Sequence, residues 1–523
     1  MGPGPALDAF VQEAPKSHVV IGPDGEVEPG KYDRVAVTVR DRGELRALRV
    51  PKGVRTRALA VWLDEGSSAL SLTPRPEWPA LTMIRSRAVD GGWLTVLRFD
   101  ASVPVHRVVS ELGRQAVWPD HVGQRGLVLA EEATDKVAAD PLDVSDPDPM
   151  VALGPLDERL LNPMGFERHV DGPVVDLSEL DWGRGPTEAL VRGLRGNLGV
   201  HADLPQATPL LAARVIAGLA MAGIPLSADR VATRVAAHLG EEVTAAITTE
   251  VDLADPQARE EHSVVLRRAA LTAYSSTAWR TRLGELAGVR VAAQPSVSVV
   301  MATRRPDLLD HALGQIGRQR GVDRLELVLA PHGFEPDIAL VREALSVGGR
   351  VAVQVVPQPG DAIFGDVLHA ALNAASGDVV LKMDDDDWYA PDVVADLLLA
   401  RSYSGAELVG MPDDVYYLEP TDETVRLGQP SEVYRQFVAG GTLMVDRGLL
   451  REAGGFRTVR RHVDAELIAA LRAAGGATYR THGLGYVLRR TDSGHTWQAD
   501  LDDLRARAVE TRPGFAPGRL LEL

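Results

Sequence analysis

The chain contains no cysteine among its 523 residues. Disulfide bonds, zinc–thiolate sites, iron–sulfur clusters and thiol nucleophiles are therefore excluded. An excess of positive charge is also missing, because 56 Lys and Arg stand against 73 Asp and Glu, which gives a formal net charge of −17. Nucleic-acid binding needs clustered Lys and Arg against the phosphates, so we expect no nucleic-acid partner.

Long apolar runs are scarce as well. The most apolar stretch, Thr208 to Leu226, contains Arg214 and is bounded by Pro209 and Pro225. It predicts a buried soluble helix, because a spanning helix needs about 20 apolar residues. The N-terminus lacks a basic stretch followed by an apolar run, which argues against a secretory signal. We therefore expect a cytoplasmic protein, with peripheral contact at the inner face of a membrane left open.

The length suggests three or four domains at roughly 150 residues each. Residues 1–130 hold short β-branched and aromatic runs separated by Gly, Pro and Asp, which predicts a β-rich domain built as a sandwich or barrel. Residues 131–158 carry nine carboxylates and four prolines. Such a stretch cannot bury enough apolar surface to offset its ordering entropy, so it predicts an acidic, proline-rich linker.

Residues 159–290 predict a mainly helical region, since apolar residues recur there at three- and four-residue spacing. One of its expected helices would have a basic face that could meet a diphosphate, an anionic membrane or the acidic linker, although a solvated face is the default. That face would consist of Arg267, Arg268, Arg280 and Arg282.

A regular alternation of strands and helices begins after Pro295. Apolar runs at 297–302, 325–330, 351–356 and 378–383 predict four strands, the first of them buried, with helical patterns between them. Such an alternation is typical of a parallel, doubly wound α/β sheet. These sheets bind ligands at the carboxyl ends of the strands, near the switch in strand order.

Four aspartates, Asp384 to Asp387, stand at the carboxyl end of the fourth predicted strand. Adjacent carboxylates repel one another, and folding them against a sheet edge is costly without a cation. In an extended backbone Asp384 and Asp386 point to the same side and can share a divalent metal. Mg²⁺ takes one or two carboxylates together with substrate phosphates. The cluster therefore predicts a metal and diphosphate site, with an acidic loop or helix cap as the alternative.

The C-terminal part contains four segments whose combination is specific: VSVVMATRRPDLL, ALNAASGDVVLKMDDDDWYAPD, FVAGGTLMVDRGLLREAGGF and VDAELIAALRAAGG. Together they resemble a family 2 glycosyltransferase of the GT-A fold over about residues 295 to 500. The resemblance implies a Rossmann-like, mostly parallel sheet over residues 291–523, ending in a helical tail. It also implies a metal-dependent, inverting enzyme of the hexosyltransferase type, which moves a sugar from a nucleotide-diphosphate sugar to a hydroxyl group.

The resemblance assigns the donor site residue by residue. Asp384 and Asp386 occupy the outer positions of the family's D-x-D motif, which holds Mg²⁺ or Mn²⁺ and, with Asp385 between them, the donor diphosphate. Thr303 and Arg304 follow the first strand, where the family contacts the nucleotide. The implied donor is a UDP-sugar.

The resemblance also places the general base at Asp464. This carboxylate would accept the proton of an acceptor hydroxyl as that oxygen attacks the anomeric carbon. Glu466 is the alternative base, and a simple helix N-cap is the structural alternative for Asp464. His495 is a candidate third metal ligand, with a structural role as its alternative.

Further positions are candidate contacts of the donor sugar or the acceptor. Aromatic rings present apolar faces to sugars, and glycine lets backbone approach a ligand closely, with core packing and a plain turn as the alternatives. These candidates are Trp388, Trp497, Gly440 and Gly441. Arg489 or Arg490 could neutralise a phosphate.

Two positions depart from the family pattern. The family usually has an aspartate after the second strand that reads the nucleotide, and this chain has Ala330, Pro331 and His332 there. Val463 replaces the glutamate expected before Asp464. The nucleotide and the geometry around the acceptor are therefore open at this point.

Two other functions remain as alternatives. A nucleotidyltransferase on the same scaffold needs a glycine-rich triphosphate loop, and ATRRPDLL has no glycine. A catalytically silent carbohydrate-binding scaffold would not need Asp384, Asp386 and Asp464 together. We expect an acceptor used in cell wall polysaccharide biosynthesis: a cell-surface glycan, a teichoic-acid-like polymer or a lipid-linked precursor. The N-terminal regions would position a long acceptor or form a homo-oligomer.

Overall fold

The structure is a computed structural model. The chain divides into two compact units, residues 1–291 and 292–523, and each is described by itself. The described residues are 5–522 with the exception of 13, 15–16, 25, 65–69, 71, 73–77, 90–91, 116–152, 181, 183–184, 287–293, 347–350 and 492–500.

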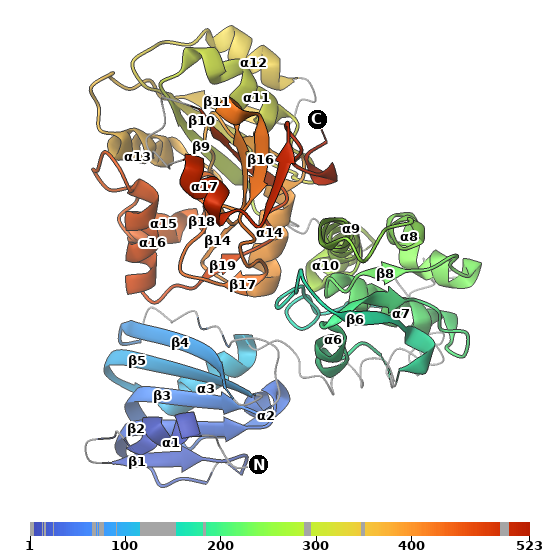
Figure 1. The fold of residues 1–523 in the computed structure, drawn as a ribbon. Coiled ribbons are helices and arrows are strands. Elements are labelled where there is room, and N and C mark those ends of the chain that lie inside the picture. Colours follow the sequence, from blue (N-terminus) through green and yellow to red (C-terminus); the bar gives the residue numbers. More distant parts are fainter. Residues whose placement is uncertain are drawn as a thin grey trace. The chain divides into compact units, whose positions relative to one another are not determined.

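The first unit begins with one five-stranded sheet in the order β1-β2-β3-β5-β4 (Figure 1). The pairs β1–β2 and β2–β3 are parallel, whereas β3–β5 and β5–β4 are antiparallel. Helices α2 and α3 pack on one face, and α1 packs on the other. The elements are α1 (Pro5–Gln12), β1 (His18–Ile21), β2 (Lys31–Val39), α2 (Arg42–Ala47), β3 (Arg55–Leu63), β4 (Leu81–Val89), β5 (Gly92–Pro104) and α3 (Val105–Gln115).

The predicted sandwich or barrel is wrong, because this region is a single mixed sheet with helices on both faces. Neighbouring residues of β2 are buried on opposite faces of the sheet. Val35 and Val37 belong to the core beneath α2 and α3, whereas Ala36 belongs to the core beneath α1. Parallel strands cannot be joined by a tight hairpin and need a crossover. The segment between β2 and β3 makes that crossover through α2, whereas its turn residues had suggested a hairpin.

The rest of the first unit combines a parallel sheet, β6-β7-β8, with helices α6 to α10. Helix α7 follows the N-cap Thr208, with Pro209 at its start. Residues 212–221 of α7 are all buried, as expected of the predicted buried helix. The elements are β6 (Gly172–Asp176), α6 (Glu188–Leu194), β7 (Asn197–His201), α7 (Pro209–Met221), β8 (Leu226–Ser227), α8 (Thr233–Thr248), α9 (Pro256–Tyr274) and α10 (Ser276–Leu286).

No helix in the described part of the chain is both long and apolar enough to cross a membrane. The prediction that Arg267, Arg268, Arg280 and Arg282 form one basic helix face is wrong. The helical pattern breaks at Ser275 between α9 and α10, and Arg267 of α9 is buried.

The end of the predicted acidic linker belongs to the folded structure. Of residues 131–158, the part 131–152 lies outside the described residues. Leu156 and Glu158 are buried. Glu158 accepts a hydrogen bond from the Ser276 N–H at 2.8 Å, which ties this end of the segment to the start of α10.

The second unit is built on an eight-stranded sheet in the order β11-β10-β9-β12-β18-β14-β19-β17. Its first four strands are parallel and correspond to the four predicted apolar runs. Helices α13, α15 and α16 pack on one face, and α11, α12 and α14 lie on the other (Figure 1). The strands are β9 (Val297–Thr303), β10 (Leu325–Pro331), β11 (Val351–Val355), β12 (Val379–Lys382), β14 (Leu408–Gly410), β17 (Val433–Tyr434), β18 (Met444–Asp446) and β19 (Thr478–Arg480). The helices are α11 (Leu309–Gly317), α12 (Ile338–Ser346), α13 (Phe364–Ala374), α14 (Val393–Ser404), α15 (Arg447–Glu452) and α16 (Val463–Ala473).

The strand order places the topological switch between β9 and β12. From β9 the chain moves outward to β10 and β11, and then returns to the opposite side of β9 as β12. Because β9 and β12 are parallel neighbours, their carboxyl ends, Thr303 and Lys382, lie at the same edge of the sheet. A doubly wound sheet binds its ligand at this edge.

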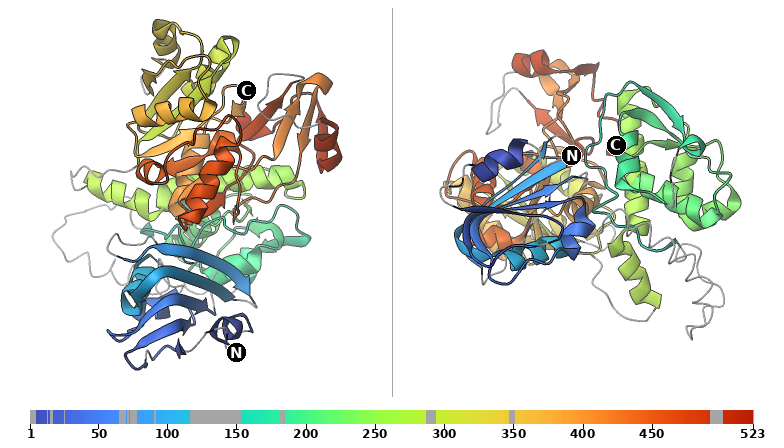
Figure 2. Two further views of the ribbon diagram at one scale, coloured as in Figure 1. Left: turned by 90° about the vertical axis from the view of Figure 1, so that its left-hand side faces the viewer. Right: turned by 90° about the horizontal axis from the view of Figure 1, so that it is seen from below.

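A second sheet of this unit, in the order β13-β20-β15-β16-β21, starts directly after the four aspartates. Figure 2 shows this sheet and α17 to one side of the main sheet. The predicted helical tail is only partly helical, because α17 is followed by strand β21 and a 3-10 turn, η6. The elements are β13 (Trp388–Tyr389), β15 (Val415–Leu418), β16 (Glu423–Arg426), β20 (Tyr486–Arg490), α17 (Leu501–Arg507), β21 (Glu510–Pro513) and η6 (Arg519–Leu521).

Candidate active site

The aspartates that follow β12 contact different cations. The backbone bends at residues 385–387, so the alternation expected of an extended chain ends at Asp384. Asp384 accepts a hydrogen bond from Lys382 Nζ at 2.7 Å, and Asp386 accepts one from Arg305 Nη1 at 2.9 Å. The two predicted metal ligands therefore lie in one site, and each is paired with a positive charge.

Arg305 was not predicted from the sequence, yet it is the arginine that contacts the cluster. Its guanidinium bridges Asp386 and Asp385, and Thr303 Oγ1 also donates to Asp385. Burial opposes the charge of Arg305, but the hydrogen bonds and charges of the two aspartates raise its pKa above the ordinary value. Thr303 and Arg305 leave the end of β9 two residues apart, which places them on one side of an extended chain. That spacing could have identified Arg305.

Arg304, the predicted nucleotide contact, pairs with a different neighbour. Its Nε donates to Nδ1 of His332 at 2.8 Å, and its Nη2 donates to the carbonyl of Gly360 at 2.7 Å. His332 follows β10 and is one of the departures from the family pattern. Burial and then the charge of Arg304 lower the pKa of His332. A neutral imidazole can accept from the guanidinium, so the pair is held without a carboxylate.

Asp387 points into the interior. Tyr486 Oη donates to one of its carboxylate oxygens, and the Arg489 N–H donates to the other at 2.9 Å. Burial raises the pKa of Asp387, and the charges of Asp386 and Asp384 raise it further. Asp387 thus joins the end of β12 to β20, and it leaves the other three aspartates at the sheet edge.

Lys382 is the last residue of β12, and its side chain is 3% exposed. Its ammonium is 2.7 Å from Asp384 Oδ1, 3.2 Å from the Gly440 carbonyl and 3.5 Å from Asp464 Oδ1. Burial opposes the charge, but Asp384 and Asp464 raise the pKa of Lys382 above its ordinary value. One buried ammonium therefore joins a predicted metal ligand to the predicted general base.

Asp464 lies in the first turn of α16. The N-cap position belongs to His462, so Asp464 is not the cap that was its structural alternative. Its side chain is 28% exposed as a whole, whereas its Oδ1, on the side of Lys382, is buried. Burial raises the pKa of Asp464, and Lys382 opposes that rise. Glu466, the alternative base, is 53% exposed and lies 4.0 Å from Arg457, outside the cluster.

Gly440 and Gly441 fit against the two carboxylates. A Cβ atom on Gly440 would stand 2.1 Å from Asp464 Oδ2. A Cβ atom on Gly441 would stand 3.0 Å from Asp384 Oδ2 and 2.8 Å from Tyr389 Oη. Both positions therefore need glycine because any side chain would displace groups of the site.

Trp388, a predicted sugar contact, belongs to an aromatic cluster of the second sheet. Its ring centroid is 4.6 Å from that of Phe515 and 5.8 Å from that of Tyr417. The indole is half-buried, so part of it packs and part stays accessible. The other predicted candidates of this region, His495 and Trp497, lie outside the described residues.

The two candidate phosphate-binding arginines of β20 have other partners. Arg489 pairs with Glu419, with Nη2 at 2.8 Å from Oε1. Arg490 is buried, and its guanidinium lies over the ring of Tyr416. Arg305 is therefore better placed for a phosphate than either residue.

The donor set suits a hard divalent cation. Carboxylate oxygens such as those of Asp384 and Asp386 are the ligands that Mg²⁺ and Mn²⁺ prefer. Asp384 is 34% exposed and can be reached from solvent. Among the described residues, no three His, Asp or Glu side chains converge into a metal cage. The set thus fits an ion that takes two carboxylates and fills its other positions with diphosphate oxygens and water.

The comparisons with known proteins identify the C-terminal part. Residues 337–468 match the model of glycosyl transferase family 2. This segment contains the Asp384–Asp387 cluster, Gly440, Gly441 and Asp464. The match confirms the resemblance for the C-terminal part and implies a GT-A, Rossmann-like fold there, in agreement with the observed strand order. It does not extend to the first unit.

Two solved structures are similar to this chain over the same part. The mannosyltransferase PcManGT from Pyrobaculum calidifontis, in complex with GDP-Man and Mn²⁺, is 18% identical with a TM-score of 0.31, over 39% of this chain and 59% of that one. S. aureus TarS 1-349, in complex with UDP-GlcNAc, is 12% identical with a TM-score of 0.31, over 40% of this chain and 64% of that one. The chain thus spans less than two thirds of either structure, and TM-scores below 0.5 support no conclusion about it. No curated protein matches the chain.

Proposed function

We propose, from the match of residues 337–468 to glycosyl transferase family 2, that the C-terminal unit is a metal-dependent inverting glycosyltransferase of the hexosyl type. It takes a sugar from a nucleotide-diphosphate sugar, for which we propose a UDP-sugar. The acceptor is a hydroxyl of a cell-surface glycan, a teichoic-acid-like polymer or a lipid-linked precursor. The observation that carries the proposal is the ammonium of Lys382, which joins Asp384 of the donor site to Asp464.

In the proposed reaction Asp464 is the general base. It accepts the proton of the acceptor hydroxyl while the hydroxyl oxygen forms a bond to the anomeric carbon. The bond from that carbon to the diphosphate oxygen breaks, and the nucleoside diphosphate leaves. The configuration at the anomeric carbon of the transferred sugar is inverted. Lys382 holds the carboxylate of Asp464 in position by its positive charge. Gly440 has no side chain and so leaves room for that carboxylate.

The donor is held at the carboxyl ends of β9 and β12. Asp384 and Asp386 would hold Mg²⁺ or Mn²⁺, which when bound neutralises charge on the diphosphate. Arg305 lies 2.9 Å from Asp386, and its planar guanidinium can form two parallel hydrogen bonds with phosphate oxygens. Arg304 and His332 occupy the neighbouring strand ends, where the nucleotide would extend.

Replacing Asp386 with asparagine should remove metal-dependent nucleotide binding. The change deletes one of two proposed carboxylate ligands and leaves Arg305 paired with the carboxylate of Asp385 alone. We expect the affinity for the nucleotide in the presence of Mn²⁺ to fall at least tenfold, about 1.4 kcal/mol. Calorimetry with UDP, GDP, CDP and dTDP, each with and without Mn²⁺, measures this. Asp323→Asn is the matched control, because Asp323 is exposed and remote from the cluster in sequence.

Each outcome of that titration decides a point. Binding of one nucleotide only with Mn²⁺, lost in Asp386→Asn and kept in Asp323→Asn, would support the donor site and identify the nucleobase of the donor. Equal binding by wild type and Asp386→Asn would remove Asp386 from the site. Binding of none of the four nucleotides would favour the silent carbohydrate-binding scaffold.

Replacing Gly440 with alanine should lower turnover by roughly 100-fold, because a displacement of about 1 Å of a catalytic group can cost that much. The new Cβ would overlap Asp464 Oδ2 and move either the carboxylate or the loop. Gly314→Ala is the control, since Gly314 lies within α11 with open space around its Cβ position. That control should keep its turnover and gain about 0.5–1 kcal/mol of stability. Full turnover by Gly440→Ala would contradict the need for a fixed Asp464.

A further inference from the structure

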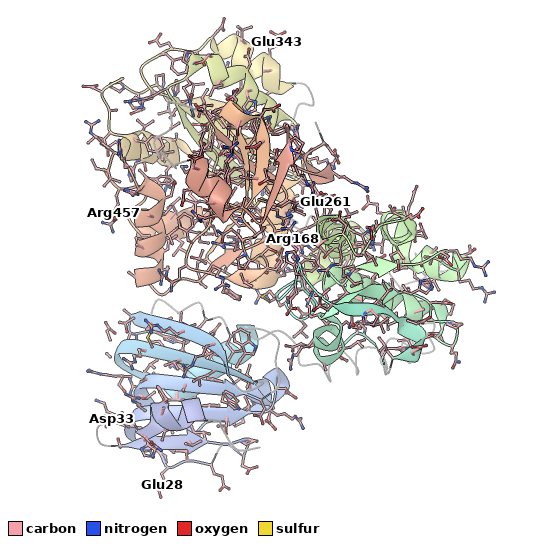
Figure 3. The ribbon with its side chains drawn as sticks, in the orientation of Figure 1. Glu28, Asp33, Arg168, Glu261, Glu343 and Arg457 are labelled. Atoms are coloured by element: carbon pink, nitrogen blue, oxygen red, sulfur yellow. The ribbon has the colours of Figure 1, made fainter. Side chains whose placement is uncertain are left out.

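A basic loop immediately precedes the helix that carries Asp464. Three arginines and one histidine occur within residues 457–462, in a chain whose formal net charge is −17. Arg457, Arg460, Arg461 and His462 are all exposed. Figure 3 shows Arg457 at the edge of the C-terminal unit, with its side chain directed into solvent. This local excess of positive charge is not explained by the donor site.

The basic loop is fixed on the start of α13. The Gly365 N–H donates to the Val459 carbonyl at 3.1 Å, and Thr458 Oγ1 donates to Asp366 Oδ1 at 2.7 Å. The backbones touch closely, because a Cβ atom on Gly365 would stand 1.7 Å from the Arg457 carbonyl oxygen. The arginines therefore project from an ordered support rather than from a free loop.

Most of the positive charge of the basic loop has no carboxylate partner among the residues that the structure describes. Arg457 reaches only Glu466, at 4.0 Å, and both side chains are more than half exposed. Among the described residues neither Arg460 nor Arg461 has a carboxylate partner. The nearby carboxylates are already engaged, since Thr458 binds Asp366 and Lys382 binds Asp464. Within the described part of the chain, two guanidinium groups thus have no carboxylate partner, and both lie within four positions of Asp464 in the sequence.

The basic loop adjoins the proposed base rather than the donor carboxylates. Asp384 and Asp386 pair with Lys382 from β12 and Arg305 from β9, whereas the loop leads directly into α16, the helix that carries Asp464. Its backbone enters α16 through His462, which adopts a left-handed conformation with φ of 62°. The proposed base takes its proton from the acceptor, so we expect charge that adjoins Asp464 in the chain to lie on the acceptor's side.

We propose that the basic loop binds a phosphate group of the acceptor, with Arg460 and Arg461 as its principal contacts. Arginine pairs with phosphate through two parallel hydrogen bonds and keeps its charge at any physiological pH. The acceptor is then anionic, a chain with phosphodiester groups near the reacting hydroxyl. This inference rests on the proposed function and narrows the three acceptor classes to those that carry phosphate.

Binding of a synthetic glycerol-phosphate hexamer, measured by calorimetry at several salt concentrations, tests the proposal. The double variant Arg460→Gln/Arg461→Gln should bind the hexamer at least tenfold more weakly than wild type. Loss of two phosphate contacts should also reduce the slope of log K against log salt concentration by about 1.4, the value for two contacts with a single-stranded polyanion. Arg230→Gln/Arg234→Gln removes the same charge from two exposed arginines of the first unit and should bind like wild type.

Three further measurements separate the outcomes. Both double variants should keep Mn²⁺-dependent nucleotide binding. If neither they nor wild type bound a nucleotide with Mn²⁺, the proposed function itself would be overturned, and not this inference alone. Equal affinity of wild type for a neutral dextran hexamer would overturn the role of phosphate. Binding to phosphatidylglycerol vesicles but not to the hexamer would replace the acceptor with a membrane surface. An unchanged affinity of the double variant for the hexamer would also overturn the proposal.

Discussion

Replacing Asp464 with asparagine is expected to lower the kcat of sugar transfer by roughly 10²–10⁴-fold, the contribution of a positioned general base. Asparagine keeps the shape that fits beside Gly440 and can still lie near Lys382, but it cannot accept the proton of the acceptor hydroxyl. Release of nucleoside diphosphate from the donor measures the rate. Calorimetry should show unchanged Mn²⁺-dependent nucleotide binding, because the substitution leaves Asp384, Asp386 and Arg305 unaltered.

The pH profile of wild type provides a second test of the same residue. Burial raises the pKa of Asp464 above its ordinary value, and Lys382 only partly opposes this. The base acts in its ionised form, so the rate should fall as the pH drops through that raised pKa. The acid limb should therefore lie above the value of about 3.9 for an unperturbed aspartate. The control is Glu466→Gln, which should keep both rate and profile; loss of rate there, with activity retained in Asp464→Asn, would make Glu466 the base.

The four parallel strands of the C-terminal unit could be predicted from sequence because their signal is local. Strands buried on both faces read as continuous apolar runs, and the runs at 297–302, 325–330 and 378–383 become the buried strands β9, β10 and β12. The run at 351–356 becomes β11, which lies at the sheet edge and is partly exposed. Their order along the chain then places the aspartates at a strand end. The metal-site prediction followed from that placement and from the charge of the cluster.

The contacts that complete the site depend on distant pairings, which one sequence does not reveal. Gly440 meets Lys382 because β18 enters the sheet antiparallel beside β12. Arg304 was expected at the nucleotide and Arg305 was overlooked, although the spacing of Thr303 and Arg305 already placed these two on one side. In the first unit, α2 was too short to stand out between β2 and β3, so a mixed sheet resembled a set of hairpins.

Replacing Lys382 with methionine should destabilise the C-terminal unit and remove most of its turnover. Methionine fills a similar volume but leaves no cation between Asp384 and Asp464. Removing one partner of a buried ion pair costs roughly 3–5 kcal/mol. These two carboxylates are 34% and 28% exposed, so water screens part of the repulsion and we expect about 2 kcal/mol. Thermal and denaturant unfolding measure the change.

A divalent cation should partly repair this variant. An ion held by Asp384 would replace the missing positive charge, and a ligand that binds only the folded state stabilises it by mass action. Mn²⁺ should therefore raise the Tm of Lys382→Met more than that of wild type. Lys52→Met changes an exposed lysine of the first unit and should shift stability by no more than about 0.5 kcal/mol. If Lys382→Met instead kept the wild-type Tm and turnover, the Lys382 ammonium would not link Asp384 to Asp464 during catalysis. Donor binding and proton transfer would then not depend on this ammonium.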